Sequence, residues 1–203
     1  MEKTLRSVDA VIFDIGGVLW RSNGIPLRDK WAVRCGLDAE SFDRIVFASE
    51  WGQQALSGQI TSAEKWKNIG SLLKLSDNDI LELRQDTWSG WWDAELFTYI
   101  HTLKPNYKLG IISDASSETR EKVKEWVNED LFEVIVISAE ERVCKPNPLI
   151  YQIALQKLAV EAPAAVFIDD RVKNVGAAQS LGMKAIHYQE YAQMRLELEK
   201  YLE

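Results

Sequence analysis

The chain has 203 residues, 46% of them hydrophobic and 27% charged, which is the composition of a globular protein long enough to form a sizeable core. A formal net charge of −7 argues against a nucleic acid or an anionic membrane as the partner, because both require a basic surface. An anionic small substrate is compatible with this charge, since one metal ion and one lysine can reverse its sign locally.

The N-terminal segment, MEKTLRSVDA, has no apolar signal core, and no apolar run approaches the ~20 residues that span a membrane. The two cysteines, Cys35 and Cys144, do not have the spacing of metal ligands. We expect them to be reduced thiols, with a disulfide as the alternative. These features favour a cytoplasmic location.

The first predicted strand lies within VDAVIFD (8–14). Its apolar residues are continuous rather than alternating, which is typical of a strand buried on both faces of a parallel sheet. The run ends in Asp14, and Gly16 and Gly17 follow almost at once. A carboxylate at the end of such a strand lies where open parallel sheets bind their ligands.

Residues 20–100 separate this strand from the next one and contain few strand-like runs. The segments TSAE (61–64) and SDND (76–79) each place a hydroxyl residue three positions before an acid, which predicts two helix starts. Because so long a connection is too large for a loop, we predict an inserted helical cap over 20–100. Residues 1–19 and 101–203 would form a discontinuous α/β core.

Seven of the eight tryptophans lie in this predicted insert, at positions Trp20, Trp31, Trp51, Trp66, Trp88, Trp91 and Trp92. One interpretation is that they fill the core of a small helical bundle. The other is that one or two of them line a pocket and stack on a sugar or an aromatic group. The candidates for that role are Trp20, Trp88, Trp91 and Trp92. The sequence leaves both interpretations open.

Four more strands are predicted after the insert, within YKLGIISD (107–114), EVIVIS (133–138), AAVFIDD (164–170) and KAIHY (184–188). Helical patterns over 117–128, 147–158 and 171–181 separate them. Asn147 is the expected N-cap of the second helix, Pro148 its first residue, and Gly182 the stop signal of the third. This alternation predicts an α/β fold with a doubly wound, Rossmann-like parallel sheet.

Polar side chains follow the predicted strands at the edge of the sheet where ligands bind. In chain order they are Asp14, Ser113, Asp114, Lys145, Asp169 and Asp170. A carboxylate can attack phosphorus, and carboxylates with a main-chain carbonyl can bind Mg²⁺. A serine hydroxyl, main-chain N–H groups and a lysine can hold phosphoryl oxygens. The set therefore indicates chemistry on a phosphoryl group.

Four motifs carry a resemblance to a known family: FDIGGVL (13–19), IISDASS (111–117), KPNPLIY (145–151) and FIDDRVKNVGAAQSLGMKAI (167–186). In this order they resemble the haloacid dehalogenase-like hydrolase superfamily, in the subgroup with a helical cap inserted after the first strand. The four motifs together extend over the whole predicted core.

The resemblance implies a role for each polar residue. Asp14 would be the nucleophile, assisted by Lys145, and Mg²⁺ would be held by Asp14, Asp170 and the main-chain oxygen of Gly16. Asp169 would reach the metal through water or orient its ligands. The expected phosphate and substrate contacts are Ser113, the main chain of Asp114, Lys145 and Gly17.

Most phosphatases of this superfamily have an aspartate where Gly16 stands, and it protonates the leaving alcohol. Such acid–base help is worth roughly 10²–10⁴-fold in rate. Glycine keeps the main-chain carbonyl and lacks the proton donor. A phosphatase with a good leaving group, or with an acid supplied by the cap or the substrate, is one interpretation. A catalytically weak binding or regulatory protein is a second.

A third interpretation is a metal-independent 2-haloacid dehalogenase, because that branch also lacks the second aspartate. The Asp169–Asp170 pair argues against it, since a metal site would then have no purpose. We therefore expect a Mg²⁺-dependent phosphatase that acts on a small phosphorylated metabolite through an aspartyl-phosphate, as a monomer or homodimer.

Overall fold

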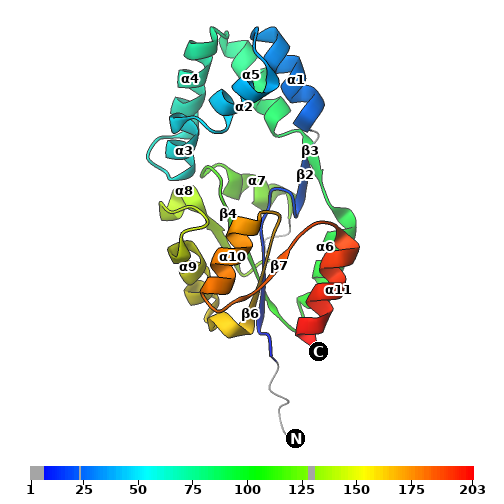
Figure 1. Ribbon diagram of the computed structural model, residues 1–203. Helices are drawn as coiled ribbons and strands as arrows, with labels where there is room; N and C mark the ends of the chain where they lie inside the picture. Colours follow the sequence, from blue (N-terminus) through cyan, green and yellow to red (C-terminus); the bar gives the residue numbers. More distant parts are fainter. Residues whose placement is uncertain (1–6, 23, 128–130) are drawn as a thin grey trace, which may run out of the picture.

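The computed structural model describes residues 7–22, 24–127 and 131–203. Five parallel strands form a sheet in the order β5-β4-β1-β6-β7, so β1 is central. The strands are β1 (Ala10–Phe13), β4 (Lys108–Ser113), β5 (Val134–Ile137), β6 (Ala165–Asp169) and β7 (Lys184–His187). Helices cover both faces of the sheet (Figure 1), which confirms the predicted doubly wound α/β fold.

The continuous apolar run of β1 follows from this arrangement. Val11 and Phe13 belong to the core on one face of the sheet, whereas Ala10 and Ile12 belong to the core on the other. The first face is covered by α6 (Ala94–Leu103), α7 (Thr119–Trp126) and α11 (Tyr191–Leu202). The second is covered by α9 (Pro148–Leu158) and α10 (Val172–Ser180).

Two of the three helices predicted between the strands begin and end close to their signals. The Asn147 side chain accepts a hydrogen bond from the Leu149 N–H at 3.0 Å, and Pro148 is the first residue of α9. Helix α10 ends shortly before Gly182, whose φ is +92°. Helix α7 begins at residue 119 rather than 117, and the predicted end at residue 128 lies outside the described residues. Two short elements complete this layer, α8 (Ser138–Glu141) and the 3₁₀ turn η1 (Ala162–Ala164).

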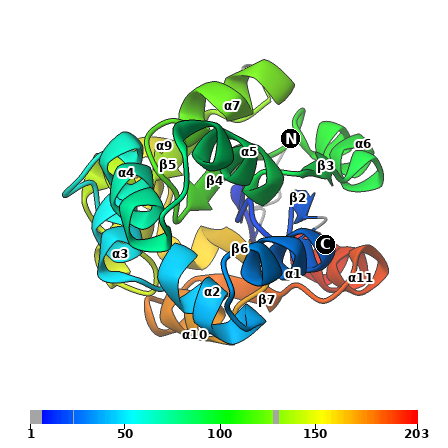
Figure 2. The same cartoon turned by 90° about the horizontal axis from the view of Figure 1, so that it is seen from above.

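Five helices form a separate group beyond the carboxyl ends of the strands (Figures 1 and 2), and we call this group the helical insert. It consists of α1 (Gly24–Arg34), α2 (Ala39–Val46), α3 (Glu50–Leu56), α4 (Ser62–Leu73) and α5 (Asp77–Thr87). The two predicted capping boxes are confirmed, at Thr61 with Glu64 and at Ser76 with Asp79. The insert has its own core, which includes Trp31, Phe42, Trp66, Ile69 and Leu83.

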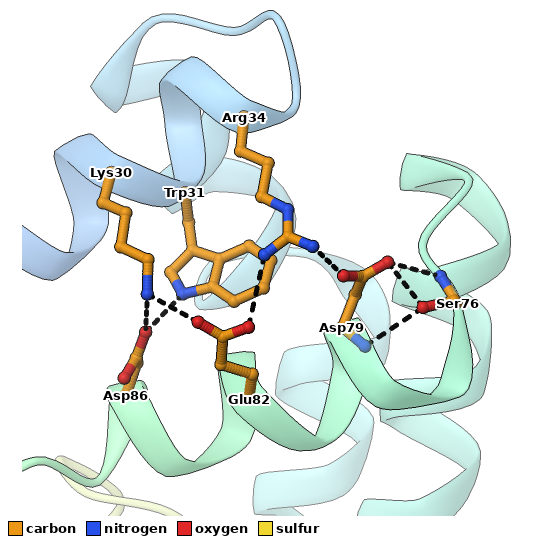
Figure 3. Close-up of polar contacts among 7 residues, drawn as sticks. All are labelled: Lys30, Trp31, Arg34, Ser76, Asp79, Glu82 and Asp86. Carbon is orange, nitrogen blue, oxygen red and sulfur yellow. Dashed lines mark hydrogen bonds and ion pairs between the residues drawn. The ribbon is translucent and has the colours of Figure 1, made fainter.

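A polar network also joins α1 to α5 (Figure 3). Lys30 lies 2.7 Å from Glu82 and 3.0 Å from Asp86, and the Trp31 indole N–H donates to Asp86 at 2.7 Å. Arg34 pairs with Asp79 and Glu82. Positions 79, 82 and 86 lie on one face of α5, so all three carboxylates meet α1. Single exposed pairs of this kind contribute little, but the network orients the two helices.

Two short strands connect the insert to the sheet, and the sequence did not predict them. Strand β2 (Trp20–Ser22) pairs antiparallel with β3 (Gly90–Trp92), so both ends of the insert leave the core side by side. Gly90 permits this close pairing, because a Cβ there would lie 2.1 Å from the Arg21 carbonyl oxygen.

The domain limits predicted at 1–19, 20–100 and 101–203 include the undescribed residues 1–6, 23 and 128–130. Within the described part, Leu96, Tyr99 and Ile100 of α6 pack in the core of the sheet rather than in the insert. We therefore propose a limit near residue 92, after β3, instead of residue 100.

Candidate active site

Asp14 lies at the carboxyl end of the central strand. Its main-chain N–H donates to the Ile168 carbonyl on β6 at 2.9 Å, and its Oδ1 accepts from the Ile15 N–H at 2.7 Å. The side chain is almost fully buried, and burial raises the pKa of Asp14 to about 7, although the Lys145 charge opposes this shift. The hydrogen bond from the Ile15 N–H orients the Asp14 carboxylate, and a positive charge beside that carboxylate would stabilise its ionised form.

Lys145 reaches the same point from the loop between α8 and α9. Its Nζ lies 2.8 Å from Asp14 Oδ1 and 2.7 Å from Asp169 Oδ2, and it donates to the Ile112 carbonyl at 3.3 Å. Burial by itself would lower the pKa of Lys145, but the neighbouring carboxylates raise it. The lysine is therefore a buried, fixed positive charge at the position where a phosphoryl group would meet Asp14.

Asp169, at the end of β6, is completely buried and accepts hydrogen bonds from several protein groups. Its Oδ1 accepts from the Arg171 N–H at 2.8 Å, and Asn174 Nδ2 lies 3.0 Å from both carboxylate oxygens. With Lys145 on Oδ2, these donors occupy the acceptor positions of this carboxylate. Asp169 therefore orients Lys145 and the start of α10.

Asp170 lies beside this cluster. Its Oδ1 is buried and has no hydrogen-bond partner among the described residues. Burial and the charge of Asp169 raise the pKa of Asp170. One carboxylate oxygen from each of Asp14, Asp169 and Asp170 lies within 4.8 Å of the other two. Because protein donors already occupy Asp169, a cation here would be held by Asp14 and Asp170, with Asp169 beside it. A hard divalent cation fits this donor set and would give Asp170 Oδ1 the partner that it lacks.

The two glycines of the first motif have different surroundings. Gly17 has φ +79°, and a Cβ there would lie only 2.5 Å from Asp170 Oδ2, so the close approach of this carboxylate requires glycine. Gly16 is exposed, and no atom lies within 4 Å of the position that its Cβ would occupy. An aspartate at position 16 would therefore fit the space.

Ser113 is the last residue of β4, and Asp114 directly follows the strand. The Ser113 side chain is buried, and both residues line a cavity between the sheet and the helical insert. Asp114 Oδ1 accepts from the Lys145 N–H at 2.8 Å, so its carboxylate holds the lysine loop. Of the sequence-predicted site residues, the structure brings Asp14, Lys145 and the pair 169–170 into one cluster. Ser113, Asp114 and Gly16 line the adjoining cavity.

The cavity has a volume of about 320 Å³. Trp20, Trp66 and Trp88 line it, whereas the Trp91 side chain is exposed elsewhere on the surface. Trp31 belongs to the core of the insert. The tryptophans therefore divide between the core of the insert and the cavity wall, with Trp66 in both, and stacking on a ligand stays a prediction. Lys65 of α4 is the basic residue among the described lining residues, and burial lowers its pKa.

Arg21 is a site residue that no pattern in the sequence indicates. Its guanidinium donates to the Gly17 carbonyl at 2.6 Å, lies 3.4 Å from Asp93 and contacts the Tyr188 hydroxyl. These contacts fix the glycine turn after Asp14 to two distant parts of the chain, at Asp93 and Tyr188. A single arginine after a tryptophan gives no sequence signal for such a role, because its partners lie up to 167 positions away.

Two further expectations concern the whole chain. Cys35 and Cys144 are both free, as predicted for reduced thiols. Within the described ranges, no helix is both long and apolar enough to cross a bilayer.

The fold and the site define a class of α/β hydrolases with an acid after the central strand, a buried lysine beside it and a carboxylate pair at the end of the neighbouring strand. A family model described as haloacid dehalogenase-like hydrolase matches residues 8–182. The chain therefore belongs to the haloacid dehalogenase-like hydrolase family, as the motifs predicted.

Individual proteins are also similar to this chain in sequence. A sesquiterpene phosphatase from Aspergillus oryzae is 30% identical over 184 residues, which cover 88% of this chain and 88% of that protein. A glyceraldehyde 3-phosphate phosphatase from Pyrococcus furiosus is 33% identical over 108 residues, or 51% of this chain and 45% of that protein. The match therefore spans less than half of the second relative.

Among solved structures, a family enzyme from Bacteroides thetaiotaomicron in complex with magnesium and inorganic phosphate has a TM-score of 0.77. It is 19% identical, and the match covers 92% of this chain and 98% of that one. At this level of identity the comparison establishes the common fold.

Proposed function

We propose that the protein is a Mg²⁺-dependent phosphatase that hydrolyses a small phosphate monoester through an aspartyl-phosphate on Asp14. The observation that carries this proposal is the contact of Lys145 with Asp14 and Asp169, next to the unpartnered Asp170 oxygen. Two phosphatases among the similar proteins support the reaction class. The structural relative with bound magnesium and phosphate supports the same metal.

The first half-reaction is transfer of the phosphoryl group to the enzyme. Asp14 Oδ1 is held by Lys145 and by the Ile15 N–H, which orients Oδ2 for attack on phosphorus. The new bond joins Oδ2 to phosphorus, while the bond from phosphorus to the ester oxygen breaks and the leaving oxygen takes a proton from water, because Gly16 supplies none. Ser113 and the adjacent main-chain N–H groups would hold phosphoryl oxygens.

In the second half-reaction, water attacks phosphorus and releases inorganic phosphate, which restores the Asp14 carboxylate. Asp14, Asp170 and the Gly16 carbonyl would hold Mg²⁺, and Asp169 would fix Lys145 beside them. A bound Mg²⁺ would supply positive charge to the phosphoryl oxygens. The cluster has three carboxylates and one lysine, and this excess of negative charge would attract such a cation.

The decisive experiment is phosphate release from a panel of phosphate monoesters with Mg²⁺, comparing the wild type with Asp14→Asn. We expect Asp14→Asn to lose on the order of 10³-fold or more in kcat, because the amide is a poor nucleophile. The matched control is Asp9→Asn, the same substitution at the exposed opposite end of β1, which should retain activity.

Gly16 favours one alternative, a binding or regulatory member of the family with little turnover. Mg²⁺ binding in the absence of Asp14-dependent turnover on every ester would select that alternative. Equal loss in Asp14→Asn and Asp9→Asn would show a general defect and would remove the evidence for Asp14 as nucleophile.

A further inference from the structure

The cavity beside the proposed reaction centre has a polar end and an apolar body. Its polar end is formed by Ser113, Asp114 and Ser116, which lie at and just after the end of β4. Large apolar side chains form much of the remaining wall: Ile15, Trp20, Phe47, Leu56, Trp66 and Trp88. A phosphoryl group at the strand ends would therefore meet polar atoms, and the rest of the substrate would meet hydrocarbon and indole surface.

A second cavity of about 160 Å³ extends this apolar surface. It shares Ile15, Trp20 and Trp88 with the first cavity and adds Trp92 and Val123. The Trp20 and Trp92 rings are in edge-to-face contact, with centroids 5.1 Å apart. The apolar surface therefore continues beyond the first cavity.

Trp20 also places this surface close to the nucleophile. Its main-chain N–H donates to the Ile15 carbonyl at 2.8 Å, and Ile15 directly follows Asp14. Trp88, which lines the same two cavities, contacts Lys122 of α7, whose Nζ lies 3.8 Å from the ring centroid. The two tryptophans are therefore held in place by groups of the sheet layer.

These walls lack the amide, guanidinium and imidazole side chains that can pair with several sugar hydroxyls at once. Among the described residues that line the two cavities, none is Asn, Gln, Arg or His. Away from the strand ends, the polar lining residues of the first cavity are Lys65 and the hydroxyl residues Ser22, Ser62, Thr87 and Thr119, and the second cavity adds Lys122 and Glu125. A site that binds a polyol pairs its hydroxyl groups, because an unpaired buried hydroxyl is costly. These walls instead favour a ligand body with few polar atoms.

We propose that the substrates are phosphate monoesters of apolar alcohols, whose hydrocarbon or aromatic body lies against Trp20 and Trp88. This inference rests on the phosphatase function proposed above and adds the substrate class. Hydrolysis breaks the bond between phosphorus and the ester oxygen. Water supplies a hydroxyl group to phosphorus and a proton to the leaving oxygen, so the products are inorganic phosphate and the apolar alcohol.

A series of straight-chain alkyl phosphates, from ethyl to octyl and kept below their micelle concentrations, tests the proposal. The leaving groups are chemically equivalent, so only contact with the cavity changes along the series. We expect kcat/KM to rise by up to about three- to fourfold per methylene until the cavity is filled. Hexyl phosphate should exceed hexitol 6-phosphate about tenfold or more, although both have six carbons.

Variants then locate the effect. Trp88→Ala should reduce the ratio of hexyl to ethyl phosphate turnover, because it removes one apolar wall. Trp91→Ala is the matched control, since its exposed side chain lies outside both cavities, and it should keep the wild-type ratio. Should Trp88→Ala fail to fold, Leu56→Gln tests the same cavity from α3.

A flat dependence on chain length, or a preference for hexitol phosphate, would overturn this inference. Asp14-dependent hydrolysis of p-nitrophenyl phosphate in the same assays would then leave the phosphatase function standing. Failure of every ester, p-nitrophenyl phosphate included, would overturn both proposals.

Discussion

At the scale of single residues, the site concentrates more negative charge than its own lysine neutralises. Lys145 contacts Asp14 and Asp169, and Asp170 adds a third carboxylate nearby. Buried charges of the same sign destabilise a fold unless a counter-charge is present. A cation would therefore stabilise this cluster. Without one, the uncompensated carboxylates lower the stability of the fold, which is typical of functional sites.

In the proposed mechanism, Gly16 leaves the departing alcohol without a proton donor at this position, and Gly16→Asp tests this. The side chain fits the open space, so we expect alkyl phosphate hydrolysis to increase by roughly 10–10²-fold, because an alkoxide needs a proton. Hydrolysis of p-nitrophenyl phosphate should change much less, since nitrophenolate leaves without one. The measurement is kcat/KM for both esters.

The control for this substitution is Gly16→Asn, which has the same shape without a titratable proton and should keep the wild-type ratio of the two rates. Equal wild-type rates on alkyl and aryl esters would contradict the prediction and indicate another acid. Lys65, which lines the cavity from the insert, is the candidate for that acid.

Gly17 determines whether Asp170 can take its position. Gly17→Ala would place a Cβ 2.5 Å from Asp170 Oδ2, so the carboxylate must move. We expect Mg²⁺ affinity to fall by about 10–100-fold, as when the support of a metal ligand is lost. Calorimetric titration with Mg²⁺ measures this without relying on turnover.

Gly182→Ala is the control for that experiment. Gly182 also has a positive φ, +92°, but no atom lies near its Cβ position. Both substitutions therefore strain the backbone, and only Gly17→Ala adds a clash with Asp170. An equal loss of Mg²⁺ affinity in both variants would mean that backbone strain, and not contact with Asp170, explains the effect.

At the scale of secondary-structure elements, the helical insert touches the sheet layer at a small number of close contacts. Ser138 Oγ of α8 donates to the Leu56 carbonyl at the end of α3 at 2.6 Å. Next to it, a Cβ on Gly58 would lie 2.0 Å from the Ala139 carbonyl oxygen. The two layers therefore approach closely only because residue 58 has no side chain.

Gly58→Ala should hold the insert away from α8. We expect kcat/KM to fall by roughly tenfold, because a helical insert that does not close over the site leaves the site open to water and incompletely assembled. Steady-state kinetics on a single ester measures the change, with a thermal melt to confirm folding. The closest control is Gly36→Ala. The φ of Gly36 is +68° and that of Gly58 is +66°, but the space around the Cβ position of Gly36 is open. The same loss in both variants would argue against a closing contact at residue 58.

At the scale of the whole molecule, stability and metal binding should be coupled. Mg²⁺ at about 100 times its Kd would stabilise the folded state by about 2.7 kcal/mol, which corresponds to roughly 5–10 °C in Tm for a chain of this size. Asp170→Asn should abolish that shift, because it removes a proposed ligand. Differential scanning calorimetry with and without Mg²⁺ measures both.

The same variant makes a second, opposite prediction. Without metal, Asp170→Asn should melt at or above the wild-type temperature, since burial and Asp169 disfavour the ionised Asp170. A lower Tm of the metal-free variant, or a full Mg²⁺ shift, would contradict the assignment of Asp170 to the metal site.

Much of this architecture was predictable because its signals are local. Continuous apolar runs indicated five buried strands, and the hydroxyl and acid pairs at Thr61 and Ser76 indicated two helix starts. The order of strands and helices predicted the doubly wound sheet. Since the carboxyl ends of parallel strands share one edge, the sequence also indicated which polar residues would meet.

The tertiary structure decided the features that depend on distant partners. The β2–β3 pair, the packing of α6 on the sheet and the contacts of Arg21 each join positions far apart in the chain. The different roles of the tryptophans also depend on which side chains of the insert face the sheet. The sequence by itself determined the order of the elements and the chemical groups at the strand ends, because those follow from local patterns. Only the folded chain decided the surroundings of each group, because burial and contact are properties of three-dimensional packing.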